Sequence, residues 1–227
     1  MSSEKILELG LLGLTAVTGL VDAVSFLSLG HVFTANMTGN VVLLAFASAG
    51  ESELSLPRSL TALLAFLSGA VLGGRIMARA SGESQIWMAL IAFGVEITCL
   101  LAATFCAIGY AASSPRSSQL YGLIALTALA MGTRNAAVRK LAVPDLTTTV
   151  LTLTLTSLAA DSFLAHGSNP RWQRRLAAVL AMIAGAALGA ILLRHSVFVT
   201  LALAAASSSL CTVALLASIF WKSRTFD

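Results

Sequence analysis

Charged residues are scarce in this sequence, at 11% of its 227 residues, while hydrophobic residues make up 57%. An average soluble domain carries about 25% charged residues, so the composition excludes an ordinary soluble protein. A membrane-spanning helix needs about 20 apolar residues, so the chain has room for roughly six to eight crossings and none for a separate soluble domain. The sequence therefore predicts an all-α integral membrane protein, with residues 1–227 forming a single domain in the lipid bilayer.

Cysteine and histidine are also rare, with three of each. Cys99 and Cys106 are seven positions apart in one apolar stretch, roughly 10 Å along a helix axis, which is too far for a disulfide. The histidines are scattered at the ends of apolar segments, so we expect no metal site and no cofactor. Motifs of hydrolases, metalloproteases and phosphate-binding loops are absent as well. We therefore do not expect an enzyme.

The basic residues do not indicate nucleic-acid binding, although the net charge is +4. They form short clusters beside apolar segments, with no aromatic residues interleaved, which is typical of cytoplasmic topology anchors. The clusters are Arg139 with Lys140, Arg171, Arg174 with Arg175, and Lys222 with Arg224. Residues 1–8 lack a basic region and a small-residue cleavage site, so we expect no cleaved signal peptide.

Eight apolar segments fall into two similar halves. They cover approximately residues 9–29, 32–49, 59–78 and 86–112, then, after a linker at 113–119, residues 120–137, 146–163, a segment opened by Pro170, and 197–221. Gly19 and Gly132 are 113 residues apart, and so are Pro57 and Pro170. The sequence therefore predicts an internal duplication, with repeats at about 9–112 and 120–221.

A pair of glycines spaced by four lies in the third segment of each half, at Gly69 and Gly73 and again at Gly185 and Gly189. Small residues at this spacing let two membrane helices approach closely. We expect these faces to pack helices within the chain, and the alternative is the seam of a homodimer.

The number of crossings separates two topologies. If the second segment of each half is re-entrant, each half crosses three times and the halves are inverted, as in many transporters. If it spans, there are eight crossings and parallel halves. Lys and Arg outside the apolar cores divide nine to three in the first case and eight to four in the second, so both place the N-terminus in the cytoplasm. The polar composition of these segments favours six crossings plus two broken segments.

The second segment begins with polar residues, in the stretch from Phe33 to Val42. Asn36, Thr38, Gly39 and Asn40 interrupt it, and polar backbone at membrane depth is tolerated where it lines a cavity or is buried in protein. A helix that opens here would direct free N–H groups into the membrane interior, which suits an anion or another small polar solute. Gly39 would permit a chain reversal or a close approach. The alternative is that these residues cap the helix and bond neighbouring helices.

A threonine-rich stretch at 146–155 is the counterpart in the second half. Thr148, Thr149 and Thr152 are its candidate solute-binding residues. The alternative is that each hydroxyl bonds the carbonyl one turn back. The alternation of threonine and leucine over 152–156 also allows a short extended piece.

Four ionisable residues lie inside apolar segments: Asp22, Arg75, Glu96 and Arg134. Such residues are costly in lipid and need partners. Asp22 and Arg134 stand in equivalent regions of the two halves, so we hypothesise that they pair, either structurally or with Asp22 as a proton or cation site. Asn135, beside Arg134, completes the candidate site, whereas Arg75 is expected to extend to the interface.

Several of these stretches resemble the YoaK-like family of small bacterial membrane proteins, a domain of unknown function. The similar stretches are 19–26, 33–40, 131–139 and 147–155, so the resemblance covers nearly the whole chain. It implies a bacterial inner-membrane protein with about six helices and no established substrate. The chain departs from the family pattern at Leu153, where glycine is common, and at Arg134, where glutamine is common.

The function favoured by these features is secondary transport of a small polar or anionic solute through a site between two half-helices. A passive channel of the same architecture is the first alternative. A membrane scaffold that binds a partner without transporting is the second.

Overall fold

The computed structural model describes residues 3–80, 84–113, 117–143 and 151–224. Within these ranges all regular structure is helical, which agrees with the all-α prediction. The elements are α1 (Ser3–Ser28), α2 (Met37–Ser48), α3 (Leu56–Met77), α4 (Ser84–Cys106), α5 (Ser117–Leu141), α6 (Leu151–Ala160), the 3₁₀ turn η1 (Phe163–Ala165), α7 (Trp172–Leu193) and α8 (Val197–Arg224). Five of the helices are long and apolar enough to cross a membrane: α1, α3, α4, α7 and α8.

Helix α5 is as long as these five but more polar, because Thr127, Thr133, Arg134 and Asn135 interrupt its apolar sequence. The first three of these side chains are fully buried. Polar side chains in a membrane helix must face protein rather than lipid. The position of α5 inside the bundle meets this requirement.

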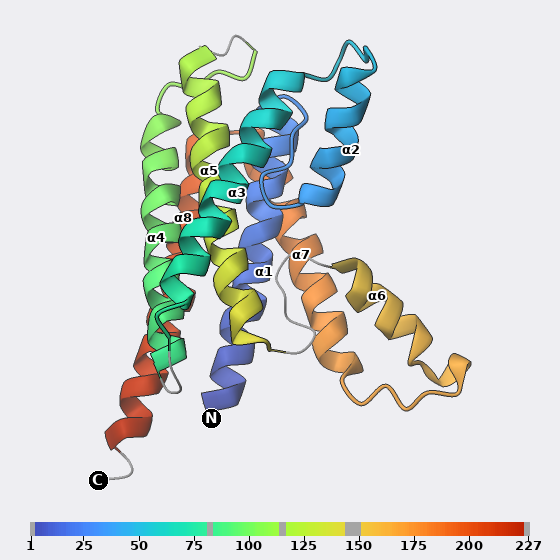
Figure 1. The fold of residues 1–227 in the computed structure, drawn as a ribbon, viewed down its shortest axis with the longest axis vertical. Helices are drawn as coiled ribbons and strands as arrows, with labels where there is room; N and C mark the ends of the chain where they lie inside the picture. Colours follow the sequence, from blue (N-terminus) through green and yellow to red (C-terminus); the bar gives the residue numbers. More distant parts are fainter. Residues whose placement is uncertain (1–2, 81–83, 114–116, 144–150, 225–227) are drawn as a thin grey trace.

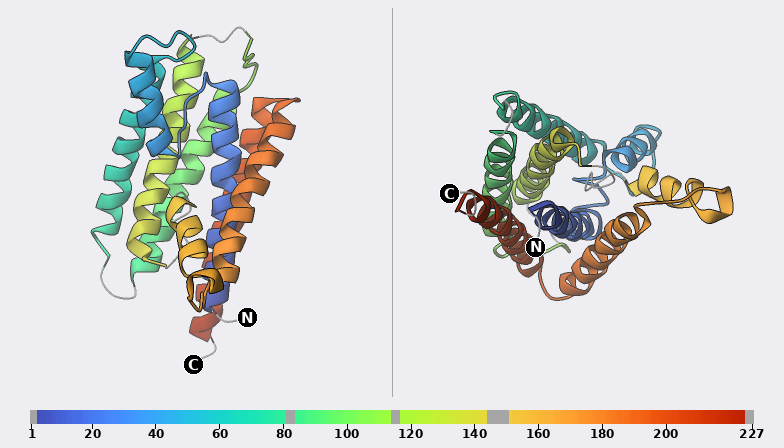
Figure 2. Two further views of the ribbon diagram at one scale, coloured as in Figure 1. Left: turned by 90° about the vertical axis from the view of Figure 1, so that its right-hand side faces the viewer. Right: turned by 90° about the horizontal axis from the view of Figure 1, so that it is seen from below.

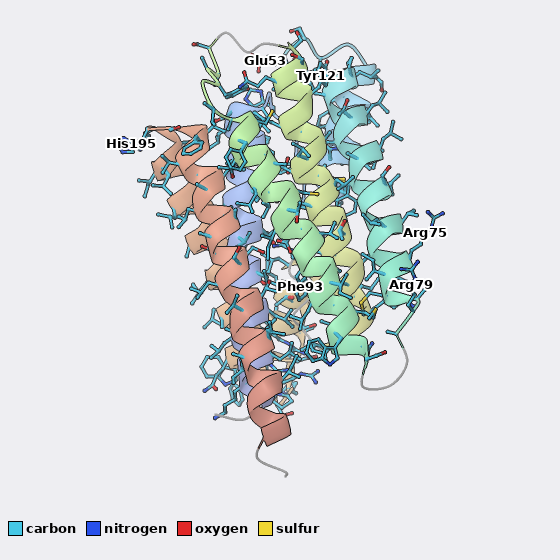
Figure 3. The ribbon with its side chains drawn as sticks, turned by 90° about the vertical axis from the view of Figure 1, so that its left-hand side faces the viewer. Glu53, Arg75, Arg79, Phe93, Tyr121 and His195 are labelled. Carbon is cyan, nitrogen blue, oxygen red and sulfur yellow. The ribbon has the colours of Figure 1, made fainter. Side chains whose placement is uncertain are left out.

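The helices form an outer layer around two central ones. Helix α5 packs mainly on α3 and α4, α1 packs mainly on α7 and α8, and α4 also contacts α8. Viewed from below, α1 and α5 lie inside an arc formed by α3, α4, α8 and α7, and the two short helices lie at its open side (Figure 2). Phe93 of α4 is fully buried and points into this bundle (Figure 3).

Corresponding helices of the two halves run in opposite directions (Figure 1). Helix α1 ascends in that view while α5 descends, α3 descends while α7 ascends, and α4 ascends while α8 descends. The two chain termini therefore lie at the same end of the molecule.

Two glycines allow the backbones of α3 and α5 to come into close contact. Gly69 lies against the backbone carbonyl of Leu129, and Gly132 lies against the backbone carbonyl of Phe66. A Cβ atom at either glycine would overlap that carbonyl oxygen. The two backbones can therefore approach this closely only where neither residue has a side chain.

The contact between α1 and α7 repeats this arrangement. Gly185 lies against the carbonyl of Ala16, and Gly19 lies against the carbonyl of Met182. These residues are the counterparts of the α3–α5 set, shifted by 113 residues for the first helix of each half and by 116 for the third. Both predicted glycine pairs thus pack helices within the chain, and these glycine faces are not free to form a dimer seam.

The two short helices, α2 and α6, lie within the second predicted segment of each half. Both begin near mid-height of the bundle and run to opposite ends (Figure 1). The alternative of a short extended piece at 152–156 does not hold, because these residues belong to α6. The Thr156 hydroxyl donates to the Thr152 carbonyl at 2.9 Å, which satisfies it inside the helix.

Adjacent glycines of α3 provide a test of the close packing. At Gly73, a Cβ atom would overlap the carbonyl oxygen of Thr133, whereas at Gly74 it would meet nothing within 4 Å. We expect Gly73→Ala to lower the free energy of unfolding in detergent by about 1 to 3 kcal/mol. The control Gly74→Ala should leave it unchanged or raise it by up to about 1 kcal/mol. Equal effects of the two substitutions would contradict the packing described here.

Candidate functional site

A cavity of about 370 Å³ lies where α2 and α6 begin. The first turns of both short helices line it, together with one residue from α3 and one from α7. The lining residues are Ala35, Asn36, Met37, Thr38, Gly39, Phe66, Leu151, Thr152 and Met182. The lining thus combines an amide, two hydroxyls and two helix N-termini with apolar side chains.

Residues from equivalent positions of the two halves face this cavity. A shift of 114 residues relates Thr38 to Thr152, and likewise Met37 to Leu151. The residues of α3 and α7 that line it are the same two whose carbonyls contact glycine in the helix contacts described above. The cavity therefore lies between the two halves, directly beside their closest backbone contacts.

Asn36 caps α2 and also lines the cavity. Its side-chain oxygen accepts a hydrogen bond from the backbone N–H of Gly39 at 3.4 Å, an N-cap that satisfies one of the free donors of the first turn. Gly39 lies inside the helix, where an added Cβ would come within 3.1 Å of the Phe33 ring. Of the two predicted roles of this glycine, the structure shows the close approach and not the chain reversal.

Asn40 does not line this cavity. It is 1% exposed and uses both ends of its amide within the protein. Its oxygen accepts from the backbone N–H of Phe33 at 3.4 Å, and its nitrogen donates to the carbonyl of Ser59 at 3.1 Å. Asn40 therefore ties the residues before α2 to the start of α3, the structural role named as the alternative. Its counterpart Thr154 is likewise the buried residue of α6.

Asp22, on α1, does not line the cavity but contacts residues that do. The carboxylate is nearly buried, and its Oδ1 accepts a hydrogen bond from the backbone N–H of Ala35 at 3.0 Å. The N–H groups of Thr34 and Asn36 also act on it. Asp22 thus positions the chain that leads into α2, and two of the residues that it holds line the cavity.

The hypothesis that Asp22 pairs with Arg134 is wrong. Arg134 is fully buried, and its Nη1 lies 2.9 Å from Oε1 of Glu96. Its Nη2 donates to the Thr18 hydroxyl at 2.6 Å, and the Ser208 hydroxyl donates to the same Glu96 oxygen at 3.0 Å. The reason is the packing of α4 on α5, which brings the carboxylate of Glu96 next to the guanidinium, while Asp22 faces the chain before α2.

The remaining predicted residues divide into three groups. Thr152 lines the cavity with Asn36, Thr38 and Gly39. The side-chain nitrogen of Asn135 donates to the Met131 carbonyl one turn back at 2.8 Å, and Asn135 is not a lining residue. Thr148 and Thr149 lie outside the residues that the structure describes.

Sequence reasoning missed the contribution of Phe66 and Met182. Their positions in the sequence could have identified them. Each precedes the first glycine of its pair by three residues, so both lie on the glycine face that turns toward the partner helix. Glu96 was recognised as needing a partner, and besides Asp22 it was the acidic residue among the four ionisable residues singled out inside apolar segments.

The Arg134–Glu96 pair allows a stability test. Arg134→Met would leave the Glu96 carboxylate buried without its cation, and we expect a loss of about 3 to 5 kcal/mol in the free energy of unfolding. The matched control is Arg75→Met, since Arg75 is exposed on α3 and points away from the bundle (Figure 3). That control should change stability by about 0.5 kcal/mol or less.

Adding Glu96→Gln to Arg134→Met should recover part of the loss, because the uncompensated charge is removed. A double variant no more stable than Arg134→Met, measured by thermal unfolding in the same detergent, would contradict the pairing.

Comparison with known proteins agrees with the membrane architecture. Residues 10–214 match the family described as "Protein of unknown function (DUF1275)". The chain is 38% identical over 154 residues to the UPF0700 transmembrane protein YoaK of Bacillus subtilis (strain 168), a match that covers 67% of this chain and 65% of that relative. No solved structure gives a significant match. The resemblance to YoaK-like proteins is confirmed, and the chain belongs to the DUF1275 family of multi-pass membrane proteins.

Proposed function

We propose that this protein is a secondary transporter of a small polar solute, preferably an anion, and that the cavity at the start of α2 and α6 is its solute site. One observation carries the proposal: equivalent residues of the two halves, at the tips of two short helices, line a single cavity. Transporters built from inverted repeats bind their solutes at such a place, between half-helices near the bilayer midplane. We propose transport rather than catalysis for the same reason.

The proposed topology has six crossings in two inverted repeats, with α5 as the sixth crossing and α2 and α6 as re-entrant helices. Its support is the opposite direction of corresponding helices and the repetition of the glycine contacts. Helices of 12 and 10 residues reach about 18 and 15 Å, which is too short for a hydrocarbon core of about 30 Å.

The preference for an anion follows from the helix ends. The first turn of an α-helix has backbone N–H groups without intrahelical partners and carries a partial positive charge. Two such ends meet at this cavity, beside the hydroxyls of Thr38 and Thr152. Among the described residues that line the cavity there is no Asp or Glu, so none of these side chains repels a negative charge.

The proposed location is the inner membrane of a bacterium, with the N-terminus in the cytoplasm. The end of the bundle that carries both termini also carries the end of α3, the end of α5 and the start of α7 (Figure 1). Most of the basic residues outside the apolar cores lie there, among them Arg79, Lys140 and Arg174. Cytoplasmic loops carry such an excess of Lys and Arg.

Cysteine labelling from both sides of the membrane tests the site. In a background without the three native cysteines, Thr38→Cys and Thr152→Cys should react with a membrane-impermeant thiol reagent in right-side-out and in inverted vesicles, because alternating access exposes the cavity to each side in turn. The matched control is Leu153→Cys. Leu153 is next to Thr152 on α6 but outside the cavity lining, and in the proposed topology its 67% exposed side chain would face lipid. This variant should react in neither. Absence of labelling at both threonine positions from both sides would refute an aqueous site.

Exchange experiments distinguish a carrier from a channel. Formate, acetate, nitrate and phosphate are the probes, and the anion that slows labelling of Thr38→Cys is then loaded, isotopically labelled, into proteoliposomes. A carrier should release the labelled anion faster when the same unlabelled anion is present outside, because the loaded site returns more readily than the empty one. Efflux that is insensitive to external anion would indicate a channel, and absence of binding and flux for all four would favour a scaffold.

A further inference from the structure

The Asp22 carboxylate is one hydrogen bond away from the cavity. It is 9% exposed and accepts from the backbone N–H of Ala35 at 3.0 Å. Ala35 and the following residue, Asn36, both line the cavity, and Asn36 is also the N-cap of α2. Asp22 therefore holds the chain that leads into α2 through hydrogen bonds from its backbone N–H groups.

The buried charges around Asp22 do not balance. Among the described residues, Arg134 on α5 is the charged side chain that acts electrostatically on Asp22, but its guanidinium is held by Glu96 of α4 at 2.9 Å. Two carboxyl groups therefore share one cation. When both are ionised, this cluster carries one excess negative charge, which is costly in a lipid environment unless a cation binds.

Within the residues that the structure describes, the other elements packed against α1 do not supply that cation. Helix α7 has Arg174 and Arg175 in its first turn, and they pair with Glu8 and Asp161 at the end of the bundle that carries the N-terminus. In the described part of α8, Val197–Ala217 contains no Asp, Glu, Lys, Arg or His.

The loop between α1 and α2 contributes one titratable group, His31. Its ring stacks edge-on against Phe26, at 5.2 Å between ring centroids, and its side chain is exposed. The loop glycine, Gly30, also lies against the side chain of Arg58, at the start of α3.

A proton fits this carboxylate better than a metal ion does. Na⁺ and other hard cations need several oxygen ligands, whereas Asp22 faces backbone N–H groups, which present hydrogens. Within the described ranges, no three His, Cys, Asp or Glu side chains gather in a group that could hold a metal ion. A proton needs only the carboxylate itself.

We propose that Asp22 binds and releases the coupling proton of the transport cycle. A proton from water in the cavity joins the carboxylate, and the resulting neutral carboxyl holds the N–H groups of residues 34–36 less firmly, because hydrogen bonds to a charged acceptor are the stronger ones. The tip of α2 is then freer to move, and loss of the proton to water on the opposite side re-forms these bonds. An anion and a proton would thus travel together. This inference rests on the proposed function and adds the coupling ion to it.

The test follows the reactivity of Thr38→Cys against pH, in the full-length protein in liposomes without native cysteines. The labelling rate is normalised to that of the unfolded protein at the same pH, which corrects for the ionisation of an unperturbed thiol. Between about pH 5 and pH 8, we expect the normalised rate to change by roughly fivefold or more. In the Asp22→Asn variant the rate should be independent of pH. The matched control is His31→Asn, which removes the exposed imidazole of the same loop and should keep the original profile.

The outcomes separate the two proposals. A pH profile that persists unchanged in Asp22→Asn, or disappears in His31→Asn, would overturn the assignment to Asp22. Labelling of Thr38→Cys that never varies with pH would overturn the proton inference alone, because it leaves the aqueous cavity in place. Absence of labelling at every pH would overturn the transport site and this inference with it. If Asp22→Asn does not fold, Asp22→Glu replaces it. A shift in the midpoint of the pH profile of labelling supports the assignment, and an unchanged midpoint overturns it.

Discussion

A backbone inside lipid must satisfy its hydrogen-bonding groups within the protein, and the arrangement of this molecule depends on that constraint. The long helices meet it by themselves. The residues before α2 are not helical, and their N–H groups are satisfied instead by Asp22 and by the side-chain oxygen of Asn40. A broken segment is tolerated here because polar side chains on α1 and on α2 itself supply the acceptors that the missing helical turn would have provided.

The same constraint places α5 at the centre. Its arginine, threonines and asparagine cannot face lipid. Neighbouring helices provide Glu96, Thr18 and the carbonyl of Gly69 as partners, while Asn135 bonds a carbonyl of α5 itself. Glycine then lets α3 approach α5, and α7 approach α1, with backbone against backbone. These two close contacts carry Phe66 and Met182 to the cavity, so the packing of the bundle and the geometry of the candidate site have a common origin.

The wrong pairing of Asp22 with Arg134 illustrates a limit of reasoning from sequence equivalence. Equivalent positions in two halves predict similar surroundings, but they do not predict which of two acidic residues is nearer to a cation. Glu96 is nearer because α4 packs directly along α5, a fact of helix packing that no local pattern in the sequence encodes. The chain departs from the family pattern at two positions, and these lie in different surroundings. Arg134 is buried in an ion pair, whereas Leu153 lies on the exposed side of α6.

The sequence by itself determined the membrane class, the segments that become helices, the two broken segments and the glycine faces, because each follows from composition or spacing over a few turns. Thr38 and Thr152 could be named as candidates on the same grounds. Only the tertiary structure decided that Asn40 is a tether, that Asp22 holds the loop and that Glu96 neutralises Arg134. Those outcomes depend on which helix faces lie together, and contacts between residues far apart in the chain set them.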